Sequence, residues 1–184
     1  EQEQVTREQR GRAKAVNFGI IYGQGAFGLA RGLGISRAEA AKFIDEYKER
    51  YPGIPKFMKT CVSEAEKNGF VTTMLGRRRP IPEIHSNNRN LRALGERLAI
   101  NTVVQGSAAD MIKRAMVNLH ERIDREELDM RLLIQVHDEL VLDAPFEKVE
   151  EYSEIVRQEM AGAIELAVPV KVDVAWGKNW LESK

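Results

Sequence analysis

The sequence predicts an α+β fold in which several helices are combined with short antiparallel strands. Capping residues and glycine or proline breaks mark off the helical segments. Two pairs of β-rich runs are each separated by a short turn, as in hairpins. With 184 residues, of which 43% are hydrophobic and 30% charged, the chain can bury a core as one domain or as two small ones.

Caps and breaks predict three N-terminal helices. The expected spans are about 6–22, 36–51 and 55–67. Thr6 and Ser36 are each followed three residues later by Gln or Glu, which is the sequence pattern of a capping box. A glycine or proline follows each span, at Gly23, Pro52 and Gly69, and ends the helix there.

The rest of the chain predicts two hairpins, two helices and a last strand. The strands are expected at 70–75, 77–81, 132–136, 140–143 and 168–176, and the helices at 87–123 and 146–165. Gly76 is the turn of the first hairpin, and Gly106-Ser107 is a point at which the long helix can bend. The last strand follows from the alternation of apolar with other residues.

The composition excludes binding through bulk charge. Lys and Arg together number 28, as do Asp and Glu, so the formal net charge is zero and neither a basic coating nor an acidic tail dominates. The one cysteine, Cys61, excludes an internal disulfide and a cysteine-rich metal site. No apolar run approaches the length of a membrane span. We expect a cytoplasmic protein without a membrane partner and, from the polar start without Met, a fragment of a longer one.

Charge is nevertheless concentrated in two segments of opposite sign. From Lys67 to Arg97 there are seven basic and two acidic residues, a net charge of +5. From Glu147 to Glu165 there are six acidic and two basic residues, a net charge of −4. We interpret the acidic segment as a solvated helix face. The basic segment is either a solvated face as well or a contact surface for phosphates.

The first predicted helix carries a row of two cations and two aromatic residues. Its members, at four-residue spacing, are Arg10, Lys14, Phe18 and Tyr22. Each lies only about 40° around the helix from the one before. Such a row suits a triphosphate at one end and a flat base or sugar at the other. The alternative is a solvated Arg and Lys with Phe and Tyr in the core.

The residues Gly23–Gly28 match the G-x-G-x-x-G pattern of dinucleotide-binding folds. Asp45 lies near the distance expected for an acid that binds ribose. That pattern needs a strand immediately before it, whereas the cation–aromatic row has helical spacing. We therefore interpret the glycines as the end of a helix, with an NAD-dependent oxidoreductase as an alternative function.

The turn of the second hairpin carries His137, Asp138 and Glu139 between two apolar strands. A hairpin tip holds a carboxylate rigidly, which suits oxygen ligation of a hard divalent cation. The alternative is an ordinary turn in which Asp bonds to nearby backbone. A His-Asp hydrolase would need further His ligands, and His85 and His120 do not supply them.

A third series lies on one face of the long helix. Arg97, Asn101 and Gln105 follow one another at four-residue spacing. Amide side chains offer donors and acceptors to base edges, and Arg reaches phosphate or minor-groove acceptors. The alternative is the polar face of a half-buried helix.

Together these constellations resemble the family A DNA polymerases, the bacterial DNA polymerase I type. The segment from Arg10 to Gly23 is similar to motif B of the fingers, and Val136-His137-Asp138-Glu139 is similar to motif C of the palm. The segment 96–110 is similar to the part that family members place against primer–template. The likeness covers nearly the whole chain. It implies a right-hand polymerase fragment, with mostly helical fingers at 1–91 and the second, antiparallel-sheet part of the palm at 92–184.

The resemblance implies template-directed DNA synthesis in DNA replication and repair, by transfer of a nucleotide from dNTP to a primer 3′-OH. The implied dNTP-binding residues are Arg10, Lys14, Phe18 and Tyr22, with Lys14 also assisting the departure of pyrophosphate. The implied palm residues are Asp138, which ligates Mg²⁺, and His137 and Glu139, which support the primer end. The implied DNA-binding residues are Arg97, Asn101, Gln105, Arg77 and Arg78.

The chain also departs from the family pattern. Two-metal chemistry needs a second carboxylate, which in the family lies in motif A, and neither motif A nor the thumb occurs in this sequence. We therefore expect an upstream polymerase segment as a partner, and we expect the isolated chain to bind nucleotide or DNA poorly and to be inactive in polymerisation. Gly25 stands where many relatives carry Ser, which removes a template contact through that hydroxyl. The alternative function is a non-catalytic DNA-binding module that relies on the basic segment.

Overall fold

The computed structural model describes residues 5–183 and combines helices with two small antiparallel sheets. The predicted α+β class is confirmed. Residues 1–4, the polar start on which the expectation of a fragment rests, and residue 184 lie outside the described residues. The chain divides into two compact units, Glu1–Gly106 and Ser107–Lys184. The functional boundary expected between residues 91 and 92 is a different division and stays a prediction.

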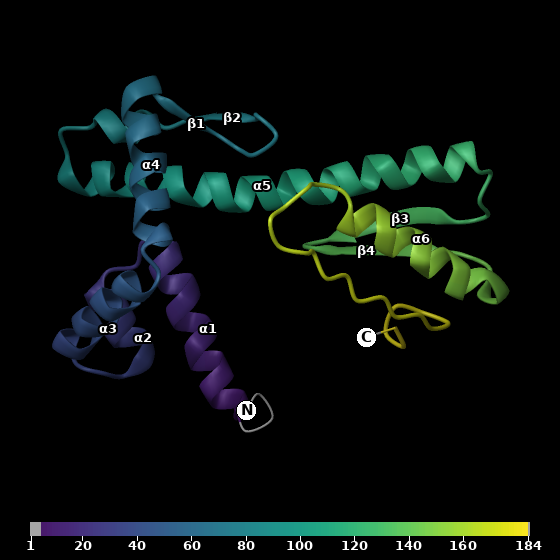
Figure 1. Cartoon of the computed structure of the whole chain (residues 1–184), viewed down its shortest axis with the longest axis horizontal. Helices are drawn as coiled ribbons and strands as arrows, with labels where there is room; N and C mark the ends of the chain where they lie inside the picture. The colour runs from purple at the N-terminus through teal and green to yellow at the C-terminus, as the bar shows by residue number, and fades with distance from the viewer. Residues whose placement is uncertain (1–4, 184) are drawn as a thin grey trace. The chain divides into compact units, whose positions relative to one another are not determined.

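The first unit begins with four helices (Figure 1). They are α1 (Arg7–Ile21), α2 (Ala26–Leu33), α3 (Arg37–Arg50) and α4 (Gly53–Asn68). The hydroxyls of Thr6 and Ser36 each accept a hydrogen bond at 3.2 Å from the backbone N–H three residues on. The Gln9 and Glu39 side chains complete both capping boxes. The predicted starts of α1 and α3 are therefore confirmed.

The helix α2 is the element that the sequence did not predict. Its glycine-rich surroundings suggest a loop, yet two of the glycines bound a helix. Gly25 is its N-cap residue, and Gly34 adopts a left-handed φ of +67° at its C-cap. The helix is stabilised by a core shared with α1 and α3, made of Val16, Ile20, Leu29, Ala30, Ala40 and Ile44.

A hairpin and the start of a long helix complete the first unit. The strands β1 (Phe70–Thr72) and β2 (Arg78–Pro80) pair antiparallel, as predicted but over fewer residues. The short helix η2 (Pro82–His85) leads to α5 (Arg89–Arg125). A second core joins α4, the hairpin, η2 and α5, and consists of Ala65, Val71, Ile81, Ile84 and Ala99. The 37-residue α5 runs unbroken through Gly106-Ser107 and is shared by the two units.

The second unit places a hairpin and a helix beside the end of α5. The strands β3 (Arg131–Val136) and β4 (Glu139–Asp143) pair antiparallel, with an irregularity between Leu132 and Ile134. The short helix η3 (Phe146–Lys148) precedes α6 (Val149–Ala161), which is shorter than predicted. The core of this unit comprises Leu119, Met130, Tyr152, Ile155 and Val156, and Leu140 and Leu142 of β4 pack against it.

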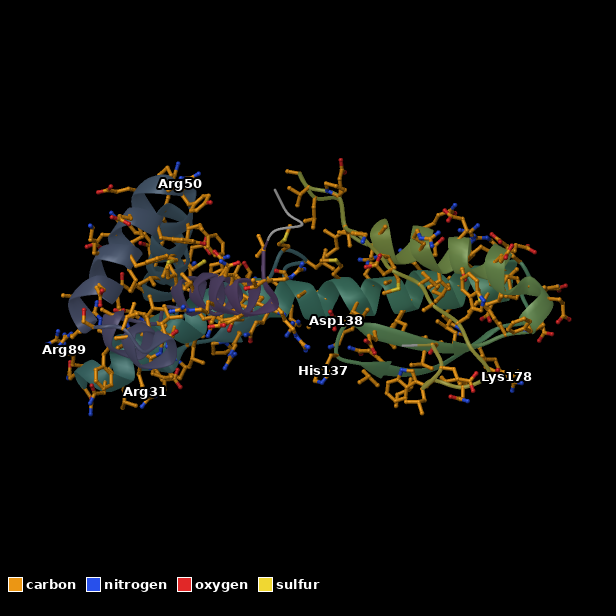
Figure 2. All side chains as sticks on the ribbon, turned by 90° about the horizontal axis from the view of Figure 1, so that it is seen from below. Arg31, Arg50, Arg89, His137, Asp138 and Lys178 are labelled. Carbon is orange, nitrogen blue, oxygen red and sulfur yellow. The ribbon has the colours of Figure 1, made fainter. Side chains whose placement is uncertain are left out.

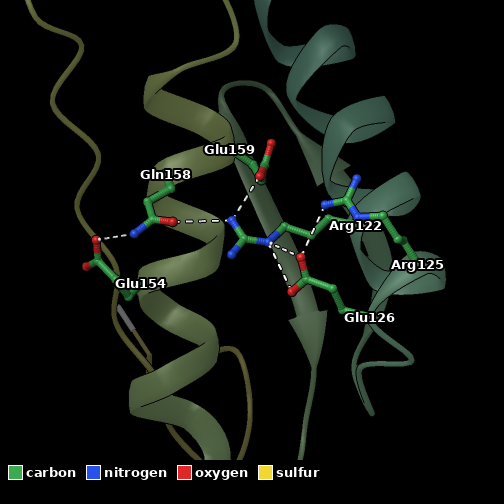
Figure 3. A network of polar contacts seen from close by, with 6 residues as sticks. All are labelled: Arg122, Arg125, Glu126, Glu154, Gln158 and Glu159. Carbon is green, nitrogen blue, oxygen red and sulfur yellow. Dashed lines mark hydrogen bonds and ion pairs between the residues drawn. The ribbon is translucent and has the colours of Figure 1, made fainter.

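Arg122 ties the end of α5 to α6 (Figure 3). Its Nη1 donates to Glu159 at 3.0 Å and to Gln158 at 3.2 Å, and its Nε donates to Glu126 at 3.1 Å. Hydrogen bonds from Arg125 and Arg122 hold the pKa of the Glu126 carboxyl below its usual value. This network fixes the two helices that pack around the β3–β4 hairpin.

The strand predicted at 168–176 is wrong. Val170, Val172 and Val174 are half-buried between exposed neighbours, so the alternation is present, but the residues form neither strand nor helix. A strand also needs a ladder of backbone hydrogen bonds, and none of the strands in the described part of the chain pairs with this segment. Over residues 5–183, no helix is both long and apolar enough to cross a membrane.

Candidate functional site

Lys14, Phe18 and Tyr22 form a continuous column along α1. The rings of Phe18 and Tyr22 are stacked, with centroids 5.9 Å apart and planes inclined by 8°. The Lys14 Nζ lies 5.7 Å from the centroid of the Phe18 ring, within the range of a cation–π contact. The predicted row is therefore a set of side chains that touch from one turn to the next. Arg10 is exposed one turn before Lys14.

This column lies outside the core, which overturns the alternative in which Phe18 and Tyr22 are core residues. The buried residues of α1 are Val16 and Ile20, on the other side of the helix. The Phe18 side chain is 45% exposed, and Tyr22 is half-buried. Two stacked aromatic rings beside a cation make an exposed surface that can receive a flat, negatively charged ligand.

At Gly23, the backbone directly after Tyr22 lies against the Arg97 side chain of α5. Its φ of +77° is a left-handed conformation that favours glycine. A Cβ at this position would lie 3.2 Å from the Cγ of Arg97, so the backbone passes closer to Arg97 than a larger residue would easily allow. Two of the predicted constellations, the α1 row and the α5 series, therefore meet within the first unit.

Gly28 of the glycine cluster and Gly19 of α1 make room for the Gln24 side chain, and the dinucleotide-binding interpretation is wrong. A helix and not a strand precedes the cluster. A Cβ on Gly19 would lie 2.3 Å from the Gln24 Oε1, and one on Gly28 would lie 2.8 Å from its Cγ. Asp45, the candidate ribose ligand, instead lines a hollow of about 290 Å³ between α1, α2 and α3.

The α5 series presents polar groups outward. Arg97 and Gln105 are exposed, and Asn101 is half-buried. The Oδ1 of Asn101 is buried and, within the described residues, has no hydrogen-bond partner. An unpaired buried acceptor costs about 1–3 kcal/mol.

Arginines of the basic segment make contacts inside the chain. The Arg77 Nη2 donates to the Gly106 carbonyl at 3.0 Å, the Arg79 Nη1 donates to the Thr102 Oγ1 at 3.0 Å, and the Arg78 Cζ lies 4.9 Å from the Phe70 ring centroid. Arg92 pairs with Glu66 at 2.7 Å. The interpretation of this segment as a merely solvated face is therefore incomplete, because part of its charge holds the hairpin and α4 to α5.

The turn of the β3–β4 hairpin is strained at His137. His137 and Asp138 are the two loop residues between the paired residues Val136 and Glu139, and Figure 2 shows both at the tip. His137 has a φ of +57°, a conformation that is uncommon outside glycine and that is found at functional turns. The Gln135 Nε2 donates to the His137 carbonyl at 2.7 Å and braces the turn. Sequence reasoning gave Gln135 no such role, since the bond depends on the turn geometry.

The hairpin tip offers exposed carboxylates to a metal but not a complete site. Asp138 supplies hard oxygen atoms of the type that Mg²⁺ prefers, and it is exposed at the tip. Across residues 5–183, no group of three or more His, Cys, Asp or Glu side chains is placed to hold a metal ion. The ligand type therefore fits Mg²⁺, but the described residues do not complete its coordination.

Comparison with known proteins places these motifs in a family. Residues 1–182 match the family described as DNA polymerase family A. The DNA polymerase I of Bacillus caldotenax is 50% identical over 183 residues, and that of Lactococcus lactis subsp. lactis (strain IL1403) is 52% identical over 182 residues. The matches cover 100% and 99% of this chain but 21% of each relative, so the chain spans about a fifth of their length.

A solved structure of a polymerase domain also matches this chain. It is the POL domain of Pol1 from M. smegmatis in complex with DNA primer-template and dNTP, which matches with a TM-score of 0.94 at 41% identity. The match covers 98% of this chain and 32% of that one. This chain therefore belongs to the family A DNA polymerases, as its motifs predicted.

Proposed function

We propose that this chain supplies the dNTP-binding face and one metal ligand of a polymerase that performs template-directed DNA synthesis. The observation that carries the proposal is the exposed column of Lys14, Phe18 and Tyr22 on α1. A cation followed by two stacked rings matches the order of a dNTP, in which phosphates are followed by a sugar and a base. The M. smegmatis neighbour, which holds primer-template and dNTP, supports this choice of ligand.

The phosphate end of the column contains the groups that stabilise charge. Arg10 and Lys14 bind the dNTP phosphates, and Lys14 stabilises the negative charge that grows on the departing pyrophosphate. Phe18 packs on the sugar, and Tyr22 borders the nascent base pair. These roles are the ones that the resemblance to the family implies, and the spacing of about 5–6 Å between consecutive helical turns is compatible with them.

The duplex is bound by the α5 series of Arg97, Asn101 and Gln105 and by the β1–β2 hairpin. Arg97 contacts phosphate or minor-groove acceptors, and Asn101 and Gln105 meet base edges there. Arg77 and Arg78 add positive charge beside the same series.

The Asp138 carboxylate would hold Mg²⁺, with His137 and Glu139 at the primer end. Two such ions polarise the phosphoryl group and lower the pKa of the attacking hydroxyl when bound. A second carboxylate must come from an upstream polymerase segment, which would also supply the thumb. The isolated chain is therefore inactive in this proposal, with 1–91 acting as fingers and 92–184 as the second part of the palm. The joined enzyme acts in DNA replication and repair.

Cross-linking of a nucleotide tests the proposal. This chain replaces the matching segment of the Bacillus caldotenax polymerase, and the chimaera is irradiated with an azido-dNTP and primer–template. Labelling of Lys14 or Tyr22 that is displaced by the natural dNTP is the expected result. Labelling elsewhere, or none at either residue while the duplex is bound, would favour the non-catalytic DNA-binding module.

A further inference from the structure

We propose that the β1–β2 hairpin positions the duplex-binding row of α5, and that Arg77 is the positioning residue. The inference rests on the proposed function, because it assumes that Asn101 and Gln105 meet the duplex. It goes beyond that function in giving Arg77 a role exerted through the backbone of α5, in addition to any contact with DNA.

The hairpin is attached to α5 at two points one helical turn apart. Arg79 donates to the Thr102 hydroxyl, and Arg77 donates to the Gly106 carbonyl, each at 3.0 Å. Thr102 and Gly106 directly follow Asn101 and Gln105 in the sequence. The two attachments therefore fix the rotation of α5 about its axis over the turn that presents both amide side chains.

The attachment at Gly106 is a close fit as well as a hydrogen bond. A Cβ at Gly106 would lie 2.7 Å from the Thr73 Cγ2, which is far inside van der Waals contact. The absence of a side chain at Gly106 thus allows the hairpin to approach the helix backbone. Without this approach, the guanidinium of Arg77 would lie further from the carbonyl.

The turn that carries Arg77 is built to keep its position. The Thr73 N–H donates to the Arg77 carbonyl at 2.9 Å, and the Arg77 N–H donates to the Thr73 hydroxyl at 3.1 Å. Gly76 closes the turn with a φ of +82°. A hairpin with strands of three residues is marginal by itself, so its geometry and that of α5 depend on the same contacts.

The test measures how tightly the Bacillus caldotenax chimaera binds primer–template over a range of salt concentrations. The variants are Arg77→Met, Gly106→Ala and the double change Gly106→Ala with Thr73→Ser, which removes the methyl group that the new Cβ would meet. Arg50→Met, at an exposed arginine that ends α3, is the matched control for loss of charge. Steady-state kinetics separates KM for DNA from kcat.

A positioning role predicts a specific pattern. Arg77→Met and Gly106→Ala each weaken binding about tenfold, the double variant recovers most of that loss, and Arg50→Met binds like the parent. The rise is in KM for DNA, while kcat changes by less than about threefold. The slope of log K against log salt stays that of the parent chimaera in Gly106→Ala, since this variant keeps every arginine.

Three results would overturn the inference. They are parental affinity in Gly106→Ala, failure of Thr73→Ser to restore it, and a salt slope in Gly106→Ala that differs from that of the parent chimaera. Circular dichroism shows whether Arg77→Met folds. If it does not, the comparison of Gly106→Ala with the double variant Gly106→Ala, Thr73→Ser still tests the positioning role, because both variants retain Arg77. Failure of the proposed function is distinguishable, since the parent chimaera would then not extend a primer.

Discussion

The α1 row and the β3–β4 turn present their functional groups in different ways. On α1, helical periodicity sets Lys14, Phe18 and Tyr22 in contact with one another, and the inner face of the helix is held by Val16 and Ile20. At the turn, a two-residue loop with a left-handed His137 carries Asp138, which directly precedes Glu139 of β4. The positions of the side chains in the row depend on contacts between those side chains, whereas the position of Asp138 depends on the backbone conformation of the turn.

This difference indicates how strongly each region depends on residues from an upstream polymerase segment. In the row, the cation and the two stacked rings are already in contact with one another. The turn offers the adjacent carboxylates of Asp138 and Glu139, and the described residues form no group of three or more such side chains that would hold a metal. We infer that the chemistry depends on an upstream segment more strongly than nucleotide binding does.

The largest effect is expected at the turn. Asp138→Asn in the chimaera should lower Mg²⁺-dependent primer extension by at least about 10³-fold, because the amide is a poor ligand for a hard cation. Binding of primer–template should change little. Single-turnover extension and a separate binding titration measure the two quantities.

Asp143→Asn is the matched control for this change. It removes a carboxylate from the other end of the same strand, where Asp143 pairs with Arg131 in the β ladder. Extension at the parental rate is expected. If Asp138→Asn also extends at the parental rate, the turn does not carry the metal ligand.

Removal of the Lys14 ammonium group from the α1 row should have the next largest effect on the rate of primer extension. Lys14→Ala is expected to slow extension on the order of 10²-fold by removing charge stabilisation of the departing pyrophosphate. Lys42→Ala, at an exposed α3 lysine 3.7 Å from Glu46, should have no such effect. Rapid-quench kinetics with varied dNTP gives both values. An unchanged rate in Lys14→Ala would contradict the role of the row.

Gly23 tests how the row is connected to α5. Gly23→Ala places a methyl group 3.2 Å from Arg97 at a φ of +77°, and it should lower the free energy of unfolding by about 1–2 kcal/mol. Gly11→Ala, with open space in the same helix, should be neutral or stabilising by up to about 1 kcal/mol. Chemical denaturation measures both. Equal stability of the two variants would show that the close approach is unimportant.

The smallest effect is expected on the stability of the fold at acid pH. Hydrogen bonds from Arg125 and Arg122 lower the pKa of Glu126, so its contribution to stability is complete above the unfolded pKa of about 4.3. It is lost as the pH falls through the lower folded pKa. Glu126→Gln should therefore flatten the acid side of the stability curve. Thermal unfolding between pH 3 and 7 measures this, and an unchanged pH profile would contradict the network.

The elements marked by local signals were predictable. Thr6 and Ser36 fixed the starts of α1 and α3 because capping boxes depend on four consecutive residues. The α1 row was predictable because its spacing equals one helical turn. By contrast, α2 was missed because Gly25 and Gly34 suggest a loop until Leu29 is seen to be buried. The strand at 168–176 was wrong because alternation predicts a face and not a pairing partner.

The contacts that refine the site could not be predicted. The bond from Arg77 to Gly106 joins residues 29 positions apart, and the approach of Gly23 to Arg97 joins α1 to α5. Both follow from packing in the first unit. The sequence identified these residues by type and left open whether the arginine faces a ligand or the chain itself.

Primer extension by this chain alone and by the chimaera tests the central claim most directly. Equal concentrations of both proteins are incubated with primer–template, all four dNTPs and Mg²⁺. We expect templated extension by the chimaera and none above background by the 184-residue chain. Steady extension by the isolated chain, or a folded chimaera that binds DNA and dNTP without extending the primer, would contradict it.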